Sequence, residues 1–162
     1  QKNDSGCGFF LAQKSANNSV LIHNKNKRSA MSRQIFVNLS VSDIQRSRQF
    51  FTALGFSINE QYSNEVAICV VIADNIFAML LKPEFYSQFT SKSLCDAHTS
   101  SEVLLCLSCS SRTEVDTIGQ AAEDNGGRIS RPGQDQGPMY GMSFEDPDGH
   151  TWELMYMEAQ NS

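Results

Sequence analysis

The sequence has no apolar run that approaches the roughly 20 residues needed for a transmembrane helix. It also lacks a basic stripe. Its formal net charge is −5, and because residues 1–30 contain five basic residues and one acidic residue, residues 31–162 carry −9. An acidic body of this kind argues against nucleic acid as the main partner, and the missing apolar run argues against a membrane partner. Hydrophobic content of 40% and charged content of 19% are typical of a globular domain.

There are five cysteines, an odd number without a CxxC pair: Cys7, Cys69, Cys95, Cys106 and Cys109. Cys106 and Cys109 lie three positions apart in a predicted strand, so they point to opposite faces and cannot bind one ion together. Cysteines scattered through apolar strands are typical of small buried side chains in a reducing compartment. The pattern argues against a disulfide framework or a zinc site, and it predicts a cytoplasmic protein.

Residues 1–30 differ in composition from the rest of the chain. They are rich in Asn, Lys and Ser, show no sustained periodicity, and end just before Met31. We interpret Met31 as the natural start and residues 1–30 as a leader, read-through or expression-derived segment without expected order. An ordered N-terminal arm that takes part in dimer contacts is the alternative. A single domain is expected over residues 31–158.

The first half of this domain, residues 32–82, begins with an alternating strand at 35–41. Asp43 is a good N-cap for the helix that follows, and Gly55 ends it. Further strands are expected at 56–60, 66–72 and 77–81. Asp74-Asn75 is a plausible hairpin turn between the last two of these strands.

A polar linking loop, residues 83–101, interrupts the pattern and holds a possible short helix at 84–89. The second half, residues 102–158, repeats the first: a strand at 102–109, a helix at 113–125 ended by Gly126-Gly127, and strands at 128–130, 139–144 and 151–157. The chain is therefore predicted to be an α+β protein of two βαβββ modules. A curved mixed sheet cannot bury its inner face alone, so we expect the two modules to pair around a shared cleft.

The stretch from Phe144 to Leu154 is the most informative part of the chain. Asp146-Pro147-Asp148-Gly149 has the chemistry of a tight turn between two strands, because proline fixes φ and glycine accepts a positive φ. The strand after the turn is apolar and aromatic except for Glu153. Burying a carboxylate is costly unless it is paired, hydrogen-bonded or bound to a metal, so Glu153 is the first candidate functional residue.

With these motifs the chain resembles the vicinal oxygen chelate superfamily, which includes glyoxalase I, bleomycin-resistance proteins and extradiol dioxygenases. The resemblance covers residues 32–158. It implies the paired-βαβββ fold and a homodimer, but it says little about reaction type, because this fold carries many activities. The motifs are residues 41–51, Leu54-Gly55-Phe56, Gly126-Gly127, Asp146-Pro147-Asp148-Gly149 and Trp152-Glu153-Leu154.

The resemblance also places the metal ligands of the family's metalloenzymes on four positions of this chain. The C-terminal glutamate ligand falls on Glu153, but the other three fall on Phe36, Met79 and Leu104. Phe, Met and Leu do not serve a hard or borderline ion. No cofactor is therefore expected, and a divalent metal is possible but disfavoured.

A displaced metal site is the alternative. Asn38 lies two residues after Phe36, and Glu102 two before Leu104, so each shares a strand face with its neighbour. Asn38, Glu102 and Glu153 would then form an oxygen-rich trio. The simpler interpretation is that Asn38 and Glu153 bond to each other or to water while Glu102 is solvated.

The strand alternation also predicts a ligand cavity around Glu153, which is the only good candidate for a catalytic base. Phe, Met and Leu there suit an apolar or aromatic ligand that Asn38 and Glu153 would orient, although core packing is the ordinary role of such apolar residues. The predicted ligand-binding residues are Phe36, Asn38, Met79, Glu102, Leu104, Cys106, Tyr140, Ser143 and Glu153, with Tyr140 and Ser143 as alternatives from one strand.

Other polar residues are weaker candidates. His150 follows the turn glycine and is expected to be exposed, whereas His98 lies in the linking loop, where a lid could bring it to a ligand. Arg128 and Arg131 are near Tyr140 and could meet a ligand anion or remain solvated. Residues 133–137 are expected to be mobile and could gate the cleft.

The sequence thus predicts a small-molecule-binding protein of the glyoxalase/bleomycin-resistance/dioxygenase type, with the usual metal site mostly lost and the ligand unassigned. The partners expected are a small organic ligand and a second copy of the chain. One alternative is a metal-dependent lyase, isomerase or dioxygenase that uses the displaced site. Another is a non-catalytic interaction module, so the residues leave open whether the protein is an enzyme.

Overall fold

The computed structural model describes residues 33–159, and the predictions for residues 1–30 lie outside the described residues. The first module contains β1 (Ile35–Ser40), α1 (Ile44–Ala53), β2 (Ser57–Ile58), η1 (Glu60–Tyr62), β3 (Ala67–Ala73) and β4 (Ile76–Leu81). The linking segment contains α2 (Pro83–Tyr86). The second module contains β5 (Leu104–Cys109), α3 (Arg112–Asp124), β6 (Arg128–Gln136), β7 (Met139–Glu145) and β8 (Thr151–Met157).

Each module forms one four-stranded mixed sheet. Sheet A has the strand order β1-β4-β3-β2 and sheet B has the order β5-β8-β7-β6. In both, the first strand of the module pairs in parallel with the last, and the other pairs are antiparallel. This architecture confirms the α+β class and the two βαβββ modules.

The helix boundaries follow from the caps that the sequence predicts. The Asp43 carboxylate accepts hydrogen bonds from the backbone N–H groups of Gln45 and Arg46, at 2.8 and 3.0 Å, and so begins α1. Gly55 and Gly126 follow α1 and α3 with φ of +94° and +96°, a conformation that costs glycine little. Ser111 caps α3 by accepting from the N–H of Glu114.

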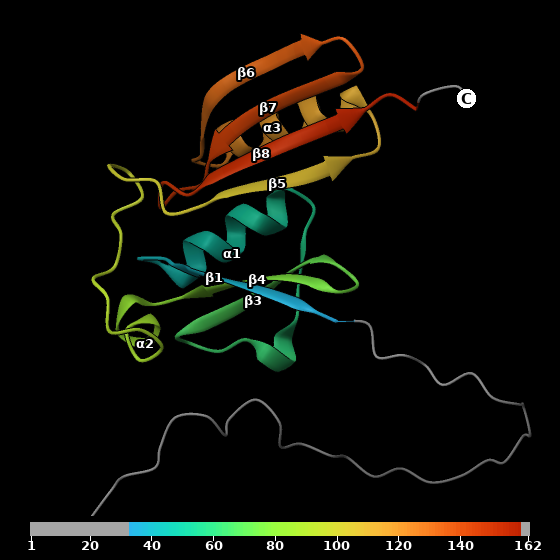
Figure 1. Cartoon of the computed structure of the whole chain (residues 1–162). Coiled ribbons are helices and arrows are strands. Elements are labelled where there is room, and N and C mark those ends of the chain that lie inside the picture. The colour runs from blue at the N-terminus through green and yellow to red at the C-terminus, as the bar shows by residue number, and fades with distance from the viewer. Residues whose placement is uncertain (1–32, 160–162) are drawn as a thin grey trace, which may run out of the picture. The chain divides into compact units, whose positions relative to one another are not determined.

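A single hydrophobic core joins the two modules through their helices. Figure 1 shows α1 between the two sheets, with α3 behind β7 and β8. Phe51 meets Trp152 with ring centroids 5.2 Å apart, and Phe50 meets Phe144 at 6.1 Å. Since the helix-facing side chains of both sheets belong to this core, the other face of each sheet points away from it.

The two sheets are consequently not closed around one cleft within the chain. Alternation puts Phe36, Asn38 and Met79 on the outward face of sheet A, and Leu104, Cys106 and Glu153 on the outward face of sheet B. The shared core lies between these two faces. A cleft lined by residues of both faces therefore does not form in one copy of the chain.

The segment at residues 133–137 differs from its prediction. Strand β6 continues from Arg128 through Pro132 and Gly133 to Gln136, so this stretch is mostly strand rather than a gating loop, and Gly137 forms the hairpin turn with φ of +74°. Proline is tolerated here because β6 is the edge strand of sheet B. Within residues 33–159, no helix is long and apolar enough to cross a membrane.

Candidate functional site

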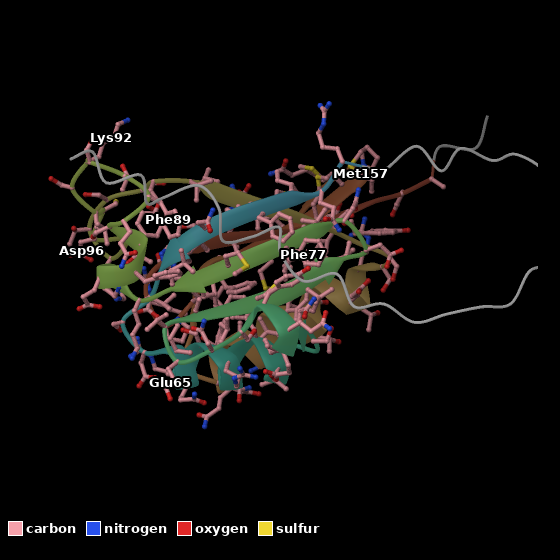
Figure 2. The ribbon with its side chains drawn as sticks, turned by 90° about the horizontal axis from the view of Figure 1, so that it is seen from below. Glu65, Phe77, Phe89, Lys92, Asp96 and Met157 are labelled. Carbon is pink, nitrogen blue, oxygen red and sulfur yellow. The ribbon has the colours of Figure 1, made fainter. Side chains whose placement is uncertain are left out.

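The outward face of sheet A is apolar and largely covered. Met79 is 3% exposed and Cys69 is fully buried, in a second hydrophobic cluster against which Phe85 and Tyr86 from α2 pack. Phe36 stacks on Phe77 with ring centroids 4.8 Å apart. Figure 2 looks onto this side of the molecule, with Phe77 labelled on it. The open part of this face therefore lies at its edge strand β1, where Phe36 is 41% exposed and Asn38 is exposed.

The outward face of sheet B carries a polar row that crosses all four strands. In register, Arg131 on β6 pairs with Ser143 on β7, Ser143 with Glu153 on β8, and Glu153 with Cys106 on β5. Ser143 is buried and Cys106 is exposed. Burial and then the charge of Glu153 raise the pKa of the Cys106 thiol, while Arg131 lowers it, so both charges act at this thiol.

Glu153 is paired with an arginine. The Arg131 guanidinium donates to the Glu153 carboxylate at 2.7 Å and to the Ser143 hydroxyl at 3.1 Å. The two charged side chains are 51% and 27% exposed. Glu153 is thus held in an ion pair on an open face and not inside an enclosed cavity of this copy.

Tyr140 and Leu104 are two further residues predicted to line the cavity. Tyr140 packs with the helix-side core, and its hydroxyl donates to Asp116 on α3 at 2.7 Å, a bond that raises the Tyr140 pKa. It therefore lies on the face opposite Glu153, whereas Ser143, the other alternative, lies on the same face as Glu153. Leu104 is 59% exposed on the edge strand β5.

Glu102 and His150 form a second cluster at the beginning of sheet B. His150 is 3% exposed, which corrects its expected exposure, because the linking loop covers it. Its Nδ1 lies 3.0 Å from a carboxylate oxygen of Asp146 and its Nε2 lies 3.3 Å from Glu102. Burial, the largest single influence, lowers the pKa of His150, but the hydrogen bond to Asp146 and the charges of Asp146, Glu102 and Asp148 give a net upward shift.

The turn at Asp146–Gly149 is organised by its two carboxylates. Asp146 accepts from the backbone N–H groups of Asp148 and His150 and from the Trp152 indole. Asp148 points to the other module and accepts from the backbone N–H and hydroxyl of Ser42 at 2.8 and 2.6 Å. The turn motif thus has a structural role that ties sheet B to the start of α1.

Two hollows of about 200 and 280 Å³ lie along the linking loop, away from the predicted cavity. Both are lined by His98 and His150; the first also includes Glu102 and Glu145, and the second Asp96 and Asp148. His98 therefore lies in the linking loop beside a hollow. This hollow is at the strand ends and not over the row that contains Glu153, so His98 does not cover that row.

The resemblance assigns metal ligands to four positions of this chain, and only one of them carries a carboxylate. Phe36, Met79 and Leu104 offer no oxygen or nitrogen ligand, and the Glu153 carboxylate is paired with Arg131. The displaced trio does not assemble in one copy, because Asn38 and Glu153 occupy different outward faces and Glu102 faces His150. Among residues 33–159, no three His, Cys, Asp or Glu side chains are arranged to hold a metal ion.

Sequence reasoning missed two features of this geometry. One is the burial of His150, for which the acidic residues at 102 and 146 were the available signal. The other is the part played by Arg131 as the partner of Glu153. The two arginines at 128 and 131 and the carboxylate at 153 are visible in the sequence, but the register that brings Arg131 opposite Ser143 depends on two irregularities in the pairing of β6.

Comparison with known proteins agrees with this fold. A sequence model of the Glyoxalase/Bleomycin resistance protein/Dioxygenase superfamily matches residues 33–154. A hypothetical protein from S. aureus is similar in structure, with a TM-score of 0.66 and 26% identity, covering 78% of this chain and 95% of that chain. A search of curated proteins finds no match.

Two further solved structures show the same fold at low identity. A lactoylglutathione lyase from Agrobacterium tumefaciens has a TM-score of 0.58 and 14% identity, covering 77% of this chain and 93% of that chain. A fosfomycin resistance protein from Mesorhizobium loti has a TM-score of 0.57 and 13% identity, covering 78% and 92%. At these identities the likeness shows the fold alone.

Proposed function

Because the chain belongs to the Glyoxalase/Bleomycin resistance protein/Dioxygenase superfamily, we propose that it is a small-molecule-binding protein whose ligand cleft is completed by a second copy. The outward face of sheet A in one copy would oppose the outward face of sheet B in the other. The ligand would lie between an aromatic wall and a polar one, without the family's divalent metal.

The observation that carries this proposal is the division of the candidate residues between two outward faces. Phe36, Asn38 and Met79 lie on one, and Glu153 and Leu104 on the other, with the shared helix core between them. Each face alone is half of a cleft. Two copies related by a twofold axis would supply two complete clefts, which is the arrangement an isologous dimer allows.

The edge strands support a second copy as the partner. β1 and β5 are edges of their sheets, and both expose large apolar side chains: Phe36 is 41% exposed and Leu104 is 59% exposed. An exposed apolar edge is normally paired or covered in a native protein. Superfamily members often dimerise, and a dimer that covers both edges would meet that need.

The chemistry of the cleft supports binding without a metal. Three of the four family ligand positions are apolar, and the fourth is an acid already paired with Arg131. The free cysteines among residues 33–159 are compatible with the expected reducing, cytoplasmic location. The alternative is an enzyme that uses a displaced metal site, and metal analysis tests it.

The test is the molar mass of the full chain in solution by light scattering. A dimer at twice the 18.0 kDa chain mass is expected, and Phe36→Glu and Leu104→Glu should each shift it to a monomer with an unchanged circular dichroism spectrum. Tyr62→Glu is the matched control, an exposed aromatic on η1 that should leave the dimer intact. A wild-type monomer would contradict the proposal and favour an interaction module.

Metal content is measured on the same protein after dialysis against Mn, Fe(II), Ni and Zn salts. We expect no stoichiometric metal to be retained. Retained metal that disappears in Glu153→Ala would contradict the metal-free part of the proposal and favour the lyase, isomerase or dioxygenase alternative.

A further inference from the structure

The position of Arg131 on β6 depends on irregular pairing between β6 and β7. The register of β6 against β7 shifts between Ile129 and Arg131, and again between Arg131 and Gln134. Bulges of this kind re-aim a side chain and are frequent beside functional sites. Their effect here is to put Arg131 opposite Ser143, in the same row as Glu153.

The segment that carries Arg131 is held in place by contacts to α3. Tyr140 donates to Asp116, and Arg112 pairs with Asp135 on β6 and lies 5.2 Å from the Tyr140 ring centroid. A Cβ at Gly133 would approach the Tyr140 hydroxyl oxygen to 2.1 Å, so glycine is needed where the strand passes this ring. These contacts with α3 therefore hold the part of β6 that carries Arg131 in place.

The Arg131 guanidinium keeps unused donors. One terminal nitrogen serves both Glu153 and Ser143, whereas Arg128 on the same strand binds Glu145 through two nitrogens, at 3.2 and 2.6 Å. Within residues 33–159, the Nε–H of Arg131 and its second terminal nitrogen have no hydrogen-bond partner. A guanidinium is a planar fork that suits the two oxygens of a carboxylate or phosphate.

The ion pair itself can exchange partners at little cost. Both members are partly exposed, and pairs of this kind stabilise a fold by at most about 1 kcal/mol. In metalloenzymes of this superfamily, as the resemblance implies, the residue at the position of Glu153 binds a cation from outside. In this chain it binds a cation that the chain itself supplies.

We propose that Arg131 is the oxyanion receptor of the ligand cleft, with Glu153 and Ser143 orienting its guanidinium toward a carboxylate or phosphonate of the ligand. This inference rests on the proposed function, since the cleft is the one that two copies complete. It narrows the ligand class to an aromatic or apolar body with an anionic head. The body would meet the exposed ring of Phe36, and the head would meet Arg131.

The experiment titrates four probes of matched shape into the ¹⁵N-labelled full chain and follows backbone amide shifts. Benzoate and phenylphosphonate are anionic, benzamide is neutral and benzylamine is cationic. Saturable shifts at residues 131, 143 and 153 are expected for the two anions, with weaker binding of the neutral and cationic probes. Arg131→Gln should weaken anion binding by about tenfold to a hundredfold, the loss expected for a charged hydrogen-bond donor.

Three further variants distinguish specific binding of the anion at Arg131 from attraction to any surface charge. Arg48→Gln removes an arginine that pairs with Glu60 on the first module, and it should leave the Kd of benzoate unchanged. Arg131→Lys should restore part of the affinity, because lysine keeps the charge but not the fork. Glu153→Gln should strengthen anion binding severalfold, because the amide oxygen can still accept from Arg131 and orient it, while the negative charge that repels the ligand anion is removed.

The outcomes distinguish this inference from the proposed function. Benzoate that binds Arg131→Gln as tightly as wild type, or benzylamine that binds as tightly as benzoate, overturns the receptor and leaves the binding protein intact. The absence of saturable shifts with all four probes also overturns the receptor. If light scattering then gives a wild-type monomer, the proposed function fails with it.

Discussion

The two outward sheet faces come from one architecture but differ in chemistry. Asn38 and Cys106 each lie five residues before the N-cap of the helix in their module, and each pairs with an inner strand. The equivalent rows are Asn38, Met79 and Cys69 on sheet A, and Cys106, Glu153 and Ser143 on sheet B. The first row is apolar at its centre, and the second carries an ion pair there.

What lies over each face explains the difference. Helix α2 contacts β1, and its Phe85 and Tyr86 cover the row on sheet A, so Met79 is buried. Sheet B instead ends in the long arm β6, whereas sheet A ends in the two-residue β2. The arm brings Arg131 to Glu153. The repeated βαβββ backbone therefore sets the position of each row. Helix α2 over sheet A and the long strand β6 in sheet B determine whether the row is buried or charged.

Exchanging the central residues of the two rows should have the largest effect on stability. Met79→Glu places a carboxylate at a site that is 3% exposed, without a cation beside it, and should cost about 3–5 kcal/mol of unfolding free energy. The reciprocal Glu153→Met should cost less than about 1 kcal/mol, because the exposed ion pair that it removes contributes little. Urea unfolding of the two variants measures both values.

Met79→Leu is the control for the shape of the buried site, and it should cost less than about 1.5 kcal/mol. If Met79→Glu loses no more than Met79→Leu, the outward face of sheet A is open to water, and the proposed contrast between the faces is wrong.

The hydrogen bonds of Asp148 that join the two modules should have the next largest effect on stability. Asp148, at the turn of the second module, accepts two hydrogen bonds from Ser42 and a third from Arg46 at 3.0 Å. Asp148→Ala should therefore lower the free energy of unfolding by about 1.5–3 kcal/mol, the range for hydrogen bonds to a charged group. Asp135→Ala, which removes an exposed ion-pair partner of Arg112, should cost less than about 1 kcal/mol in the same urea titration. Equal losses would contradict the linking role of Asp148.

The residues that follow the turns of the two modules differ in burial, and one of them makes stability depend on pH. Ile76 follows the turn of the first module and is exposed, whereas His150 in the second is buried between Asp146 and Glu102. The pKa of His150 lies above its ordinary value, so the folded state binds the proton more tightly. This stabilisation is complete below the unfolded pKa and is lost as pH rises through the folded pKa.

Urea midpoints of wild type and His150→Gln measure this effect between about pH 6 and about pH 9. The advantage of wild type should shrink with rising pH, because the folded state loses the tightly bound proton. Glu102→Gln should move the loss to lower pH, since it removes one of the charges that raise the pKa. An advantage that grows with pH would show that His150 is held neutral.

Local patterns in the sequence predicted the elements well. Asp43 and Gly55 mark the ends of α1, and the alternation over 151–157 gives β8 with its correct limits. These predictions succeed because caps, turns and alternation are set by neighbours along the chain. The family positions at Phe36, Met79, Leu104 and Glu153 also fall on outward faces, as strand parity requires.

The candidate site could not be predicted to the same extent, because it depends on contacts between distant segments. His150 looked exposed beside a turn glycine, yet the linking loop covers it. Residues 133–137 are predicted to be mobile, yet β6 continues to Gln136 with irregular pairing. The expected cleft within one chain required the outward faces to meet, but apolar residues of α1, such as Phe50 and Phe51, pack toward both sheets and keep those faces apart.

Labelling of the cysteine thiols compares the exposure of the two faces in the unmodified wild-type protein. Cys69 is fully buried on sheet A, whereas Cys106 is exposed on sheet B. N-ethylmaleimide should therefore label Cys106 in native protein and leave Cys69 unmodified, as peptide mass mapping would show. Because burial and Glu153 raise the pKa of Cys106, labelling should speed up as pH rises and the thiolate fraction grows. Benzoate should slow labelling of Cys106 if the anion binds at Arg131 beside it, and unchanged labelling in saturating benzoate would place the ligand elsewhere.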